Sequence, residues 1–554
     1  MLILINAFLL YALFFSGLGQ SNNTNTKFFA FLPSYATKVK QVAQGISLNI
    51  NGNKRERQCK QFLLLRSAYL STPLQIVEPL SNLIVLSLLF SSVLFLNSPQ
   101  CFNTCVILTN SYICDSYASF FKVLVCLCSA ASIALAIADI KIYNASSNNN
   151  YVNYEFLLVI YLSIIGMLCL ISSYNFLTFY LSIELQSLSF YLLACSKSRC
   201  EFSAEAGLKY FILGAFSSAF LLFGISLIYG STGSIYFDDV ACLLQSASNF
   251  KESTLDFYSV ANWDLESLNS FKQAPNYLIG LVVGLACIII SLLFKLAAVP
   301  FHMWAPDVYE GSPMSVTAFF ALTAKVAALA VLARFVVMTD MLLLELLSLV
   351  TLSTLVVGTL SAMRQIKIKR LIAFSGISNV GWFLLGLCTG SLQSVILHLI
   401  VYITLNIILF SILINPHYCY ESTGKSNNYK MISDLSQIYK TNSTVALALT
   451  LAFFSLGGIP FLAGFYSKYL LLNSAIQAEA LTLLFVGLLS AVVSAFYYMR
   501  VVKTIYFNDI NSANFSLAVP SYTNAYLIAL CSFFSLLFII YPEIISVWLM
   551  LITF

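Results

Sequence analysis

The stretch FKLAAVPFHMWAPDVYEGSP, residues 294–313, places a lysine, a proline and a histidine at the end of a long apolar run. The residues before it, 278–293, carry no charge. About 20 apolar residues are enough to cross a hydrocarbon core about 30 Å thick, so Lys295 falls inside a predicted transmembrane helix. Pro300 lacks a backbone N–H and clashes with the preceding turn. We therefore expect this helix to be broken near Pro300.

The composition of the whole chain agrees with a membrane protein. The chain has 554 residues, of which 59% are hydrophobic and 9% charged, whereas a soluble domain carries about 25% charged residues. The apolar runs are continuous and lack the alternation of a transmembrane β-barrel. Since backbone groups in lipid must be satisfied within the segment, the sequence predicts an all-α, polytopic transmembrane helix bundle.

About fourteen membrane-spanning helices are predicted. They lie near 2–20, 76–96, 119–141, 154–173, 175–195, 205–229, 277–309, 313–338, 341–362, 370–389, 392–414, 442–475, 480–507 and 521–551. The twelfth is similar to the seventh, because Pro460 interrupts it and Lys468 follows. Interrupted helices at corresponding positions of two halves are typical of inverted repeats. We therefore expect two discontinuous helices within two inverted five-helix repeats.

These repeats divide the chain into five predicted parts. They are a first helix with a basic loop (1–75), additional N-terminal helices (76–153), a first half (154–338), a second half (339–510) and a C-terminal helix (511–554). Residues 1–75 are apolar and then basic, which is also the pattern of a targeting segment. A retained first helix followed by an extra loop is the interpretation we prefer.

The loops predict the orientation of the bundle. Segment 21–75 holds eight Lys/Arg and one acid, and the loop 364–370 adds four cations, whereas the loop 231–275 holds six acids and two lysines. Basic loops stay on the cytoplasmic or matrix side. We therefore expect 21–75 and 364–370 on that inner side, with 21–75 contacting partner subunits or anionic lipid, and 231–275 on the outer side.

Ionisable residues within the spans are the candidate functional residues, because such groups are costly in lipid and mark ion pathways. Those that lie away from the likely span ends are Glu184, Lys209, Lys295, Lys325 and Lys468. Lys209 lies near a span end, so it could instead reach the interface or pair with Glu205 at i,i+4. His302 follows Lys295 by seven residues, about two helical turns, and histidine titrates near neutral pH. This set suits the movement of protons.

The sequence offers no site for a cofactor, a metal or a nucleic acid. The 14 cysteines have no metal-binding spacing, and the three histidines do not form a matched pair for haem. Cys101, Cys105 and Cys114 lie between spans, so a disulfide among them is an open alternative to the inert thiols that buried cysteines usually are.

Several longer stretches resemble one family. They are YLSIELQSLSFYLLA (180–194), EAGLKYFILGAFSSAFLLFGISLIYGSTG (205–233), FKLAAVPFHMWAPDVYEGSPMSVTAF (294–319), IKRLIAFSGISNVGW (368–382) and GGIPFLAGFYSKYLL (457–471). Together they resemble the subunit 2 family of respiratory NADH:ubiquinone oxidoreductase (complex I), especially its mitochondrial members. The resemblance covers about 154–510, and the first 150 residues match poorly.

This resemblance implies a proton-translocating, antiporter-like subunit of the complex I membrane arm. The enzyme would be NADH:ubiquinone reductase (H⁺-translocating), with FMN and iron–sulfur clusters in other subunits and no redox chemistry in this chain. Its partners would be other membrane-arm and accessory subunits, phospholipids and protons. The implied location is the mitochondrial inner membrane rather than a bacterial plasma membrane. The alternatives are a subunit of a cation/proton antiporter and a structural subunit that has lost pumping.

The resemblance also implies residue roles. Glu184 would pair with Lys209, Lys295 would be the central lysine of the first half, and Lys468 would be the terminal lysine. His302 and Lys325 would link the halves. Lys295, His302, Lys325 and Lys468 would then lie at similar depth along the plane of the bilayer. The chain departs from the family at Asn379, where many relatives have a histidine.

Overall fold

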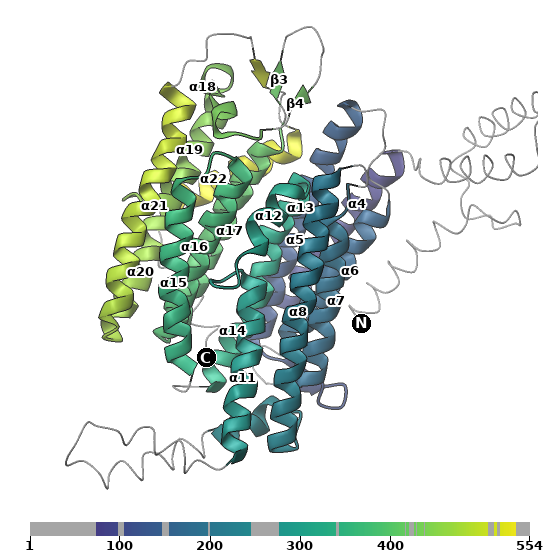
Figure 1. Cartoon of the computed structure of the whole chain (residues 1–554). Helices are drawn as coiled ribbons and strands as arrows, with labels where there is room; N and C mark the ends of the chain where they lie inside the picture. Colours follow the sequence, from purple (N-terminus) through teal and green to yellow (C-terminus); the bar gives the residue numbers. More distant parts are fainter. Residues whose placement is uncertain are drawn as a thin grey trace, which may run out of the picture. The chain divides into compact units, whose positions relative to one another are not determined.

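The computed structural model describes residues 74–97, 105–146, 154–197, 200–244, 276–339, 343–415, 417–419, 426–427, 429–436, 438–507, 515–517 and 521–538 (Figure 1). The chain forms two compact units, 1–77 with 152–158 and 78–151 with 159–554. The described part of the smaller unit is the first turn of two helices. All features below lie in the larger unit.

Helices make up most of the described residues, and two of them, α4 and α6, begin in the smaller unit. The helices are α4 (Leu74–Leu96), α5 (Ser116–Ser146), α6 (Tyr154–Ser172), α7 (Phe176–Ala194), α8 (Glu201–Thr232), α11 (Asn276–Leu296), α12 (Trp304–Gly311), α13 (Met314–Phe319), a π-helix (Phe320–Ala324), α14 (Lys325–Thr339), α15 (Leu344–Met363), α16 (Ile368–Cys388), α17 (Leu392–Leu413), a 3₁₀ helix (Ile432–Leu435), α18 (Ile438–Thr441), α19 (Ser443–Gly457), α20 (Ala463–Gln477), α21 (Leu481–Phe507) and α22 (Tyr522–Leu537).

This architecture confirms the predicted all-α bundle. Within the described residues, eleven helices are long and apolar enough to cross a membrane, and two shorter apolar helices are α19 and α22. These thirteen correspond to the second to fourteenth predicted spans. The first predicted span, 2–20, and the basic segment 21–75 lie outside the described residues. The division of the chain into two inverted halves stays a prediction.

Small residues allow neighbouring helices to approach closely, as is common in membrane bundles. A Cβ atom on Gly224 of α8 would lie 2.6 Å from the carbonyl oxygen of Gly284 on α11. The reverse contact, from Gly284 to the Gly224 carbonyl, would be 2.8 Å. These two helices therefore pack backbone to backbone. The most enclosed spans are 314–339, 368–388 and 392–413, and Lys325 on the first of them lies inside the protein rather than against lipid.

The seventh span is broken near Pro300, as predicted. α11 ends at Leu296, Ala297 has a φ of 60°, the Val299–Pro300 peptide is cis, and α12 begins at Trp304. The Trp304 indole Nε1 donates to the Phe294 carbonyl at 3.0 Å, so the protein itself supplies a partner for one carbonyl in the last turn of α11.

The twelfth span is broken near Pro460, also as predicted. α19 ends at Gly457, and Gly458 follows with a φ of 79°, a conformation that glycine adopts without steric cost. α20 begins at Ala463. The Gly464 amide donates to the Ser455 hydroxyl at 3.0 Å, which ties the first turn of α20 to the last turn of α19.

A third irregularity was not predicted. The eighth span contains the π-helix Phe320–Ala324 directly before Lys325. π-helical turns inside α-helices are rare and are frequent at functional sites. The wider turn changes the direction in which the residues after it point. No sequence pattern signals this turn, because the residues FALTA are ordinary helix formers.

Short strands connect some of the spans. β1 (Cys105–Ile107) and β2 (Tyr112–Cys114) form an antiparallel hairpin, while β3 (His417–Cys419) pairs with β4 (Ser426–Asn427) and β5 (Phe515–Leu517). Isolated bridges join Tyr112 to Ser173 and Asn175 to Tyr236. The hairpin, the α6–α7 connection and the segment after α8 therefore lie at one end of the bundle, which we call the outer end.

The basic loop 364–370 lies at the opposite, inner end. Near the start of α8, Lys209 binds Asp307, and Asp307 binds Arg370. α8 thus runs from the basic loop at its beginning to Tyr236 just beyond its end. The prediction that the loops 231–275 and 364–370 lie on opposite sides is confirmed for their described residues.

Candidate functional site

Three lysines lie in separate elements of the bundle: Lys325 and Lys468 are buried, and Lys295 is half-buried with a buried Nζ. Lys295 is in the last turn of α11, before the first break, and Lys468 is on α20, after the second break. Lys325 follows the π-helix. Lys325 and Lys468 are 7% and 5% exposed, so neither reaches a membrane surface as a long lysine near a span end would.

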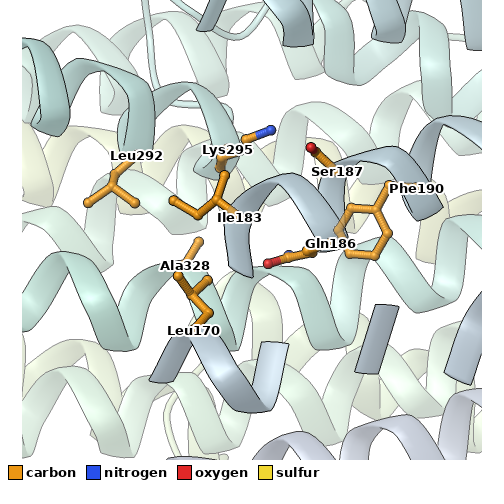
Figure 2. Close-up of a pocket in the computed structure, with 8 residues that line it drawn as sticks. All are labelled: Leu170, Ile183, Gln186, Ser187, Phe190, Leu292, Lys295 and Ala328. Carbon is orange, nitrogen blue, oxygen red and sulfur yellow. The ribbon is translucent and has the colours of Figure 1, made fainter. Parts of the chain in front are cut away.

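Lys295 borders a small cavity (Figure 2). Its Nζ has no hydrogen-bond partner among the described residues, and it lies 5.9 Å from the centre of the Tyr191 ring. The cavity volume is about 10 Å³, close to the lower limit for one water molecule. It is lined by Leu170, Ile183, Gln186, Ser187, Phe190, Leu292, Lys295 and Ala328. A water here would find the amine and the polar side chains of Gln186 and Ser187.

Glu184 belongs to this part of the site. It lies on α7, one turn before Ser187, and its carboxylate interacts electrostatically with Lys295. One carboxylate oxygen is buried without a hydrogen-bond partner, and the other is 3.5 Å from the Ser187 hydroxyl. The acid therefore faces the Lys295 region, and its unpaired carboxylate oxygen can accept a further hydrogen bond.

The predicted contact between Glu184 and Lys209 is wrong. The Lys209 Nζ binds the Glu205 carboxylate at 2.8 Å and the Asp307 carboxylate at 3.0 Å. The alternative i,i+4 pair with Glu205 is thus confirmed, and Asp307 adds a partner that the sequence did not reveal. The cause is the rotational setting of α8, which turns Lys209 toward α12 at the inner end, where its side chain is 45% exposed.

Asp307 extends this pair into an ion network. Arg370 at the start of α16 donates to the other Asp307 oxygen at 3.1 Å and also binds Glu310. Lys367 binds Glu310 as well. The network connects α8, α12 and α16 at the inner end of the bundle. Because its members are largely exposed, each pair contributes little stability, but together they fix the end of α12 that follows the first break.

Lys325 is held by neutral oxygen atoms only. Its Nζ donates to the Gly376 carbonyl at 3.0 Å and to the Tyr402 hydroxyl at 2.9 Å. Gly376 is on α16 and Tyr402 is on α17. No carboxylate forms an ion pair with Lys325 in the part of the chain that the structure describes. A buried ammonium without a counter-charge is sensitive to charges that appear nearby.

His302 lies in the connection between α11 and α12 and is half-buried. Its Nδ1 is buried without a hydrogen-bond partner, and its backbone carbonyl accepts from the Ala305 amide at 3.0 Å. The described contacts do not join its ring to Lys295 or Lys325. Its role as a link between the two lysines stays a prediction.

Lys468 closes the second break. Its Nζ donates to the Leu456 carbonyl at 2.7 Å and lies 5.6 Å from the centre of the Trp382 ring. Leu456 is in the last turn of α19, where carbonyls have no partner within the helix. The lysine therefore satisfies a carbonyl that the interruption at Pro460 leaves free.

His398 is a site residue that sequence reasoning missed. It is 3% exposed on α17, and its Nδ1 lies 3.0 Å from the hydroxyl of Ser467, the neighbour of Lys468. Its Nε2 is buried without a partner. Its ring packs 5.2 Å from that of Phe383, which in turn lies 5.7 Å from Tyr402. His398 thus lies between the partner of Lys325 and the neighbour of Lys468.

A sequence signal for this arrangement was available. His398 and Tyr402 are four residues apart on one predicted helix, so they share a face. From the sequence we consider His398 only as a haem ligand, and its spacing from Tyr402 is the signal that points beyond that role. Asn379, which stands where many relatives have a histidine, lies one turn before Trp382 and Phe383, whose rings contact His398. Asn379 is 4% exposed, and its side chain donates to the Ser375 carbonyl at 2.8 Å.

Among the described residues, no group of three or more His, Cys, Asp or Glu side chains lies close enough together to bind a metal ion.

Comparisons with known proteins converge on one family. Residues 173–494 match the family model described as "NADH:quinone oxidoreductase/Mrp antiporter, TM". The chain is 36% identical over 440 residues to NADH-ubiquinone oxidoreductase chain 2 of Marchantia polymorpha, covering 78% of this chain and 82% of the relative. It is 37% identical over 456 residues to NADH-quinone oxidoreductase subunit N of Pelagibacter ubique, covering 81% and 87%.

Solved structures agree with the sequence relatives. A chain of respiratory complex I from Thermus thermophilus with bound aureothin is similar with a TM-score of 0.67 and 27% identity, over 87% of this chain and 96% of that one. A chain of the Mrp complex from Dietzia sp. is similar with a TM-score of 0.68 and 18% identity, over 87% and 92%. The second likeness shows a shared fold.

Proposed function

The chain belongs to the NADH:quinone oxidoreductase/Mrp antiporter family, among the subunit 2 (subunit N) proteins of complex I, and from this premise we propose that it translocates protons. It is a multi-pass membrane protein. In this proposal it forms part of the complex I membrane arm, and NADH oxidation and quinone reduction take place in other subunits. Its partners are the other complex I subunits, phospholipid and protons, in a mitochondrial inner membrane.

The observation that carries the proposal is the setting of Lys325. This lysine is enclosed by protein and held by a carbonyl and a hydroxyl, and it has no counter-ion among the described residues. Such a lysine changes its proton occupancy when a neighbouring charge changes. Tyr402, His398 and Ser467 lie between it and Lys468. Glu184 and Lys295 lie on the other side of the site, next to a cavity of about one water molecule. These groups form a series of proton-binding positions.

The two alternatives are supported less well. The Mrp likeness, at 18% identity, is a likeness of fold, and antiporter subunits share it with complex I subunits. A structural subunit that had lost pumping would not need to keep buried lysines, which are costly in a membrane. Purification from native membranes separates the first alternative: co-purification with flavin- and iron–sulfur-containing subunits supports the complex I assignment, and a complex without them contradicts it.

Lys295→Met and Lys295→Arg are both expected to reduce proton pumping and coupled quinone reduction, by about tenfold or about 1.4 kcal/mol on the barrier. Methionine cannot bind a proton, and arginine stays protonated and is larger, in a cavity of only about 10 Å³. Pumping is measured in reconstituted vesicles, and assembly by NADH oxidation with an artificial electron acceptor. Normal pumping by an assembled Lys295→Met enzyme would contradict the proposal.

His398→Gln is expected to reduce pumping several-fold while the complex still assembles. Glutamine has a similar length and keeps a hydrogen bond to Ser467, but it does not titrate. Asn379→His places a titratable ring one turn from the same aromatic side chains on α16. The double variant His398→Gln with Asn379→His is therefore expected to regain part of the lost pumping. Unchanged pumping in His398→Gln would remove the histidine from the series.

A further inference from the structure

The β1–β2 hairpin at the outer end brings two cysteines together. Cys105 and Cys114 are direct partners in its antiparallel register, followed by Val106 with Ile113 and Ile107 with Tyr112. Both thiols are free in this structure and partly exposed. Directly opposite residues of an antiparallel pair have their side chains on the same face and their Cα atoms about 4.5 or 5.5 Å apart. Both distances lie within the range of about 4.4–6.8 Å for disulfides.

We propose that Cys105 and Cys114 form a disulfide that closes this hairpin on the outer face of the membrane. The side of the membrane supports the proposal. The hairpin contacts the α6–α7 connection through the Tyr112–Ser173 bridge, at the end of the bundle opposite the basic loop 364–370. Because basic loops remain inside, the hairpin faces the outer compartment, which is the intermembrane space for the proposed mitochondrial inner membrane. This side corresponds to the oxidising periplasmic side of a bacterial membrane, where disulfides persist.

The closed hairpin would hold elements that carry the candidate site. The Ser111 carbonyl in its turn accepts from the Tyr174 amide at 3.1 Å and from the Thr178 hydroxyl of α7 at 3.2 Å. α7 also carries Glu184. Asp115, directly after Cys114, binds Arg334 of α14 through both carboxylate oxygens at 2.7 Å. The hairpin therefore fixes the outer ends of the helices that carry Glu184 and Lys325.

The bond forms by thiol–disulfide exchange with an oxidised dithiol oxidoreductase of the outer compartment. One thiol loses its proton, and the thiolate attacks the disulfide of the oxidant to give a mixed disulfide. The second thiolate then attacks the mixed disulfide and releases the oxidant as a dithiol. Two electrons pass to the oxidant, and the two protons of the cysteines balance those that the dithiol gains. The competing thiols are Cys101, which is close in sequence, and Cys169 of α6, which lies near Tyr112.

The test uses the native complex in membranes. Free thiols are blocked with a maleimide at once on lysis, and the protein is digested with chymotrypsin, which cuts after Leu108 and Tyr112. We expect peptides containing Cys105 and Cys114 to stay joined, without maleimide, until a reductant is added. Maleimide on both cysteines, or a bond from either one to Cys101 or Cys169, would overturn the proposal.

A second measurement tests the side of the membrane and the effect on the hairpin. A membrane-impermeant phosphine reductant applied from the outer side is expected to speed protease cleavage at 108–112 by about fivefold, because the hairpin then opens locally. The variant with both Cys105→Ser and Cys114→Ser should be cleaved at the fast rate with or without reductant. Cys200→Ser, an exposed cysteine before α8, is the matched control and should behave as the wild type. Cleavage that does not respond to the reductant would contradict the proposal.

Discussion

Lys325→Met is expected to abolish most proton pumping, with a fall in coupled NADH:quinone turnover of about tenfold or more, equal to at least ~1.4 kcal/mol on the barrier. Methionine keeps the length and the apolar stem of lysine but cannot bind a proton. The Tyr402 hydroxyl would lose its contact with the ammonium, and an unsatisfied buried group costs about 1–3 kcal/mol. This cost is offset because a buried ammonium without a counter-ion is no longer present. Assembly is therefore expected to continue.

Gly376→Ala tests the same position without removing the lysine. A Cβ atom on Gly376 would lie 2.7 Å from the Lys325 Nζ, so the ammonium must move away from the Gly376 carbonyl. We expect a smaller loss of pumping than in Lys325→Met, with normal assembly.

Lys122→Met is the matched control for Lys325→Met, because Lys122 is also a lysine within a span, near Asp115 at the outer end of α5. Normal pumping by an assembled Lys325→Met enzyme would remove this lysine from the proposed series, and failure to assemble would favour a structural role.

Gly464→Ala is expected to prevent most assembly of the complex. A Cβ atom at this position would lie 1.7 Å from the Ser455 carbonyl oxygen and 2.6 Å from its carbonyl carbon. Both are backbone atoms of α19, so α19 and α20 must move apart. The hydrogen bond from the Gly464 amide to the Ser455 hydroxyl and the contact of Lys468 with the Leu456 carbonyl would then be lost. Overpacking of this kind costs about 1–3 kcal/mol and occasionally more.

The amount of assembled complex on a native gel and its Tm measure this effect. Gly230→Ala is the matched control, because a Cβ on Gly230 of α8 would meet nothing within 4 Å. Alanine is favoured over glycine in a helix by about 1 kcal/mol, so this variant should assemble as well as the wild type. Wild-type Tm and assembly in Gly464→Ala would show that the second break tolerates separation of its two helices.

The sequence by itself determined the architecture. Long apolar runs without alternation require helices, because lipid offers the backbone no hydrogen-bond partner. Pro300 and Pro460 interrupt two of these runs, and both breaks were found where they were predicted. The candidate ionisable residues could also be identified from the local sequence. A lysine within a long apolar run is costly in a membrane, so a functional role is the default interpretation. Periodicity, composition and proline chemistry act within about twenty residues and need no knowledge of neighbours.

Only the tertiary structure decided which of these groups meet. The helices that carry Lys325, Tyr402 and His398 are apolar on nearly all sides, so no polar face fixes their rotation in advance. Packing against neighbouring helices sets that rotation. It turned Lys209 toward Asp307 rather than Glu184, brought Tyr402 to Lys325 across 77 residues of sequence, and placed His398 beside Ser467. The π-helix before Lys325 also belongs to the tertiary level, because its residues 320–323 are buried and contact α5 and α17.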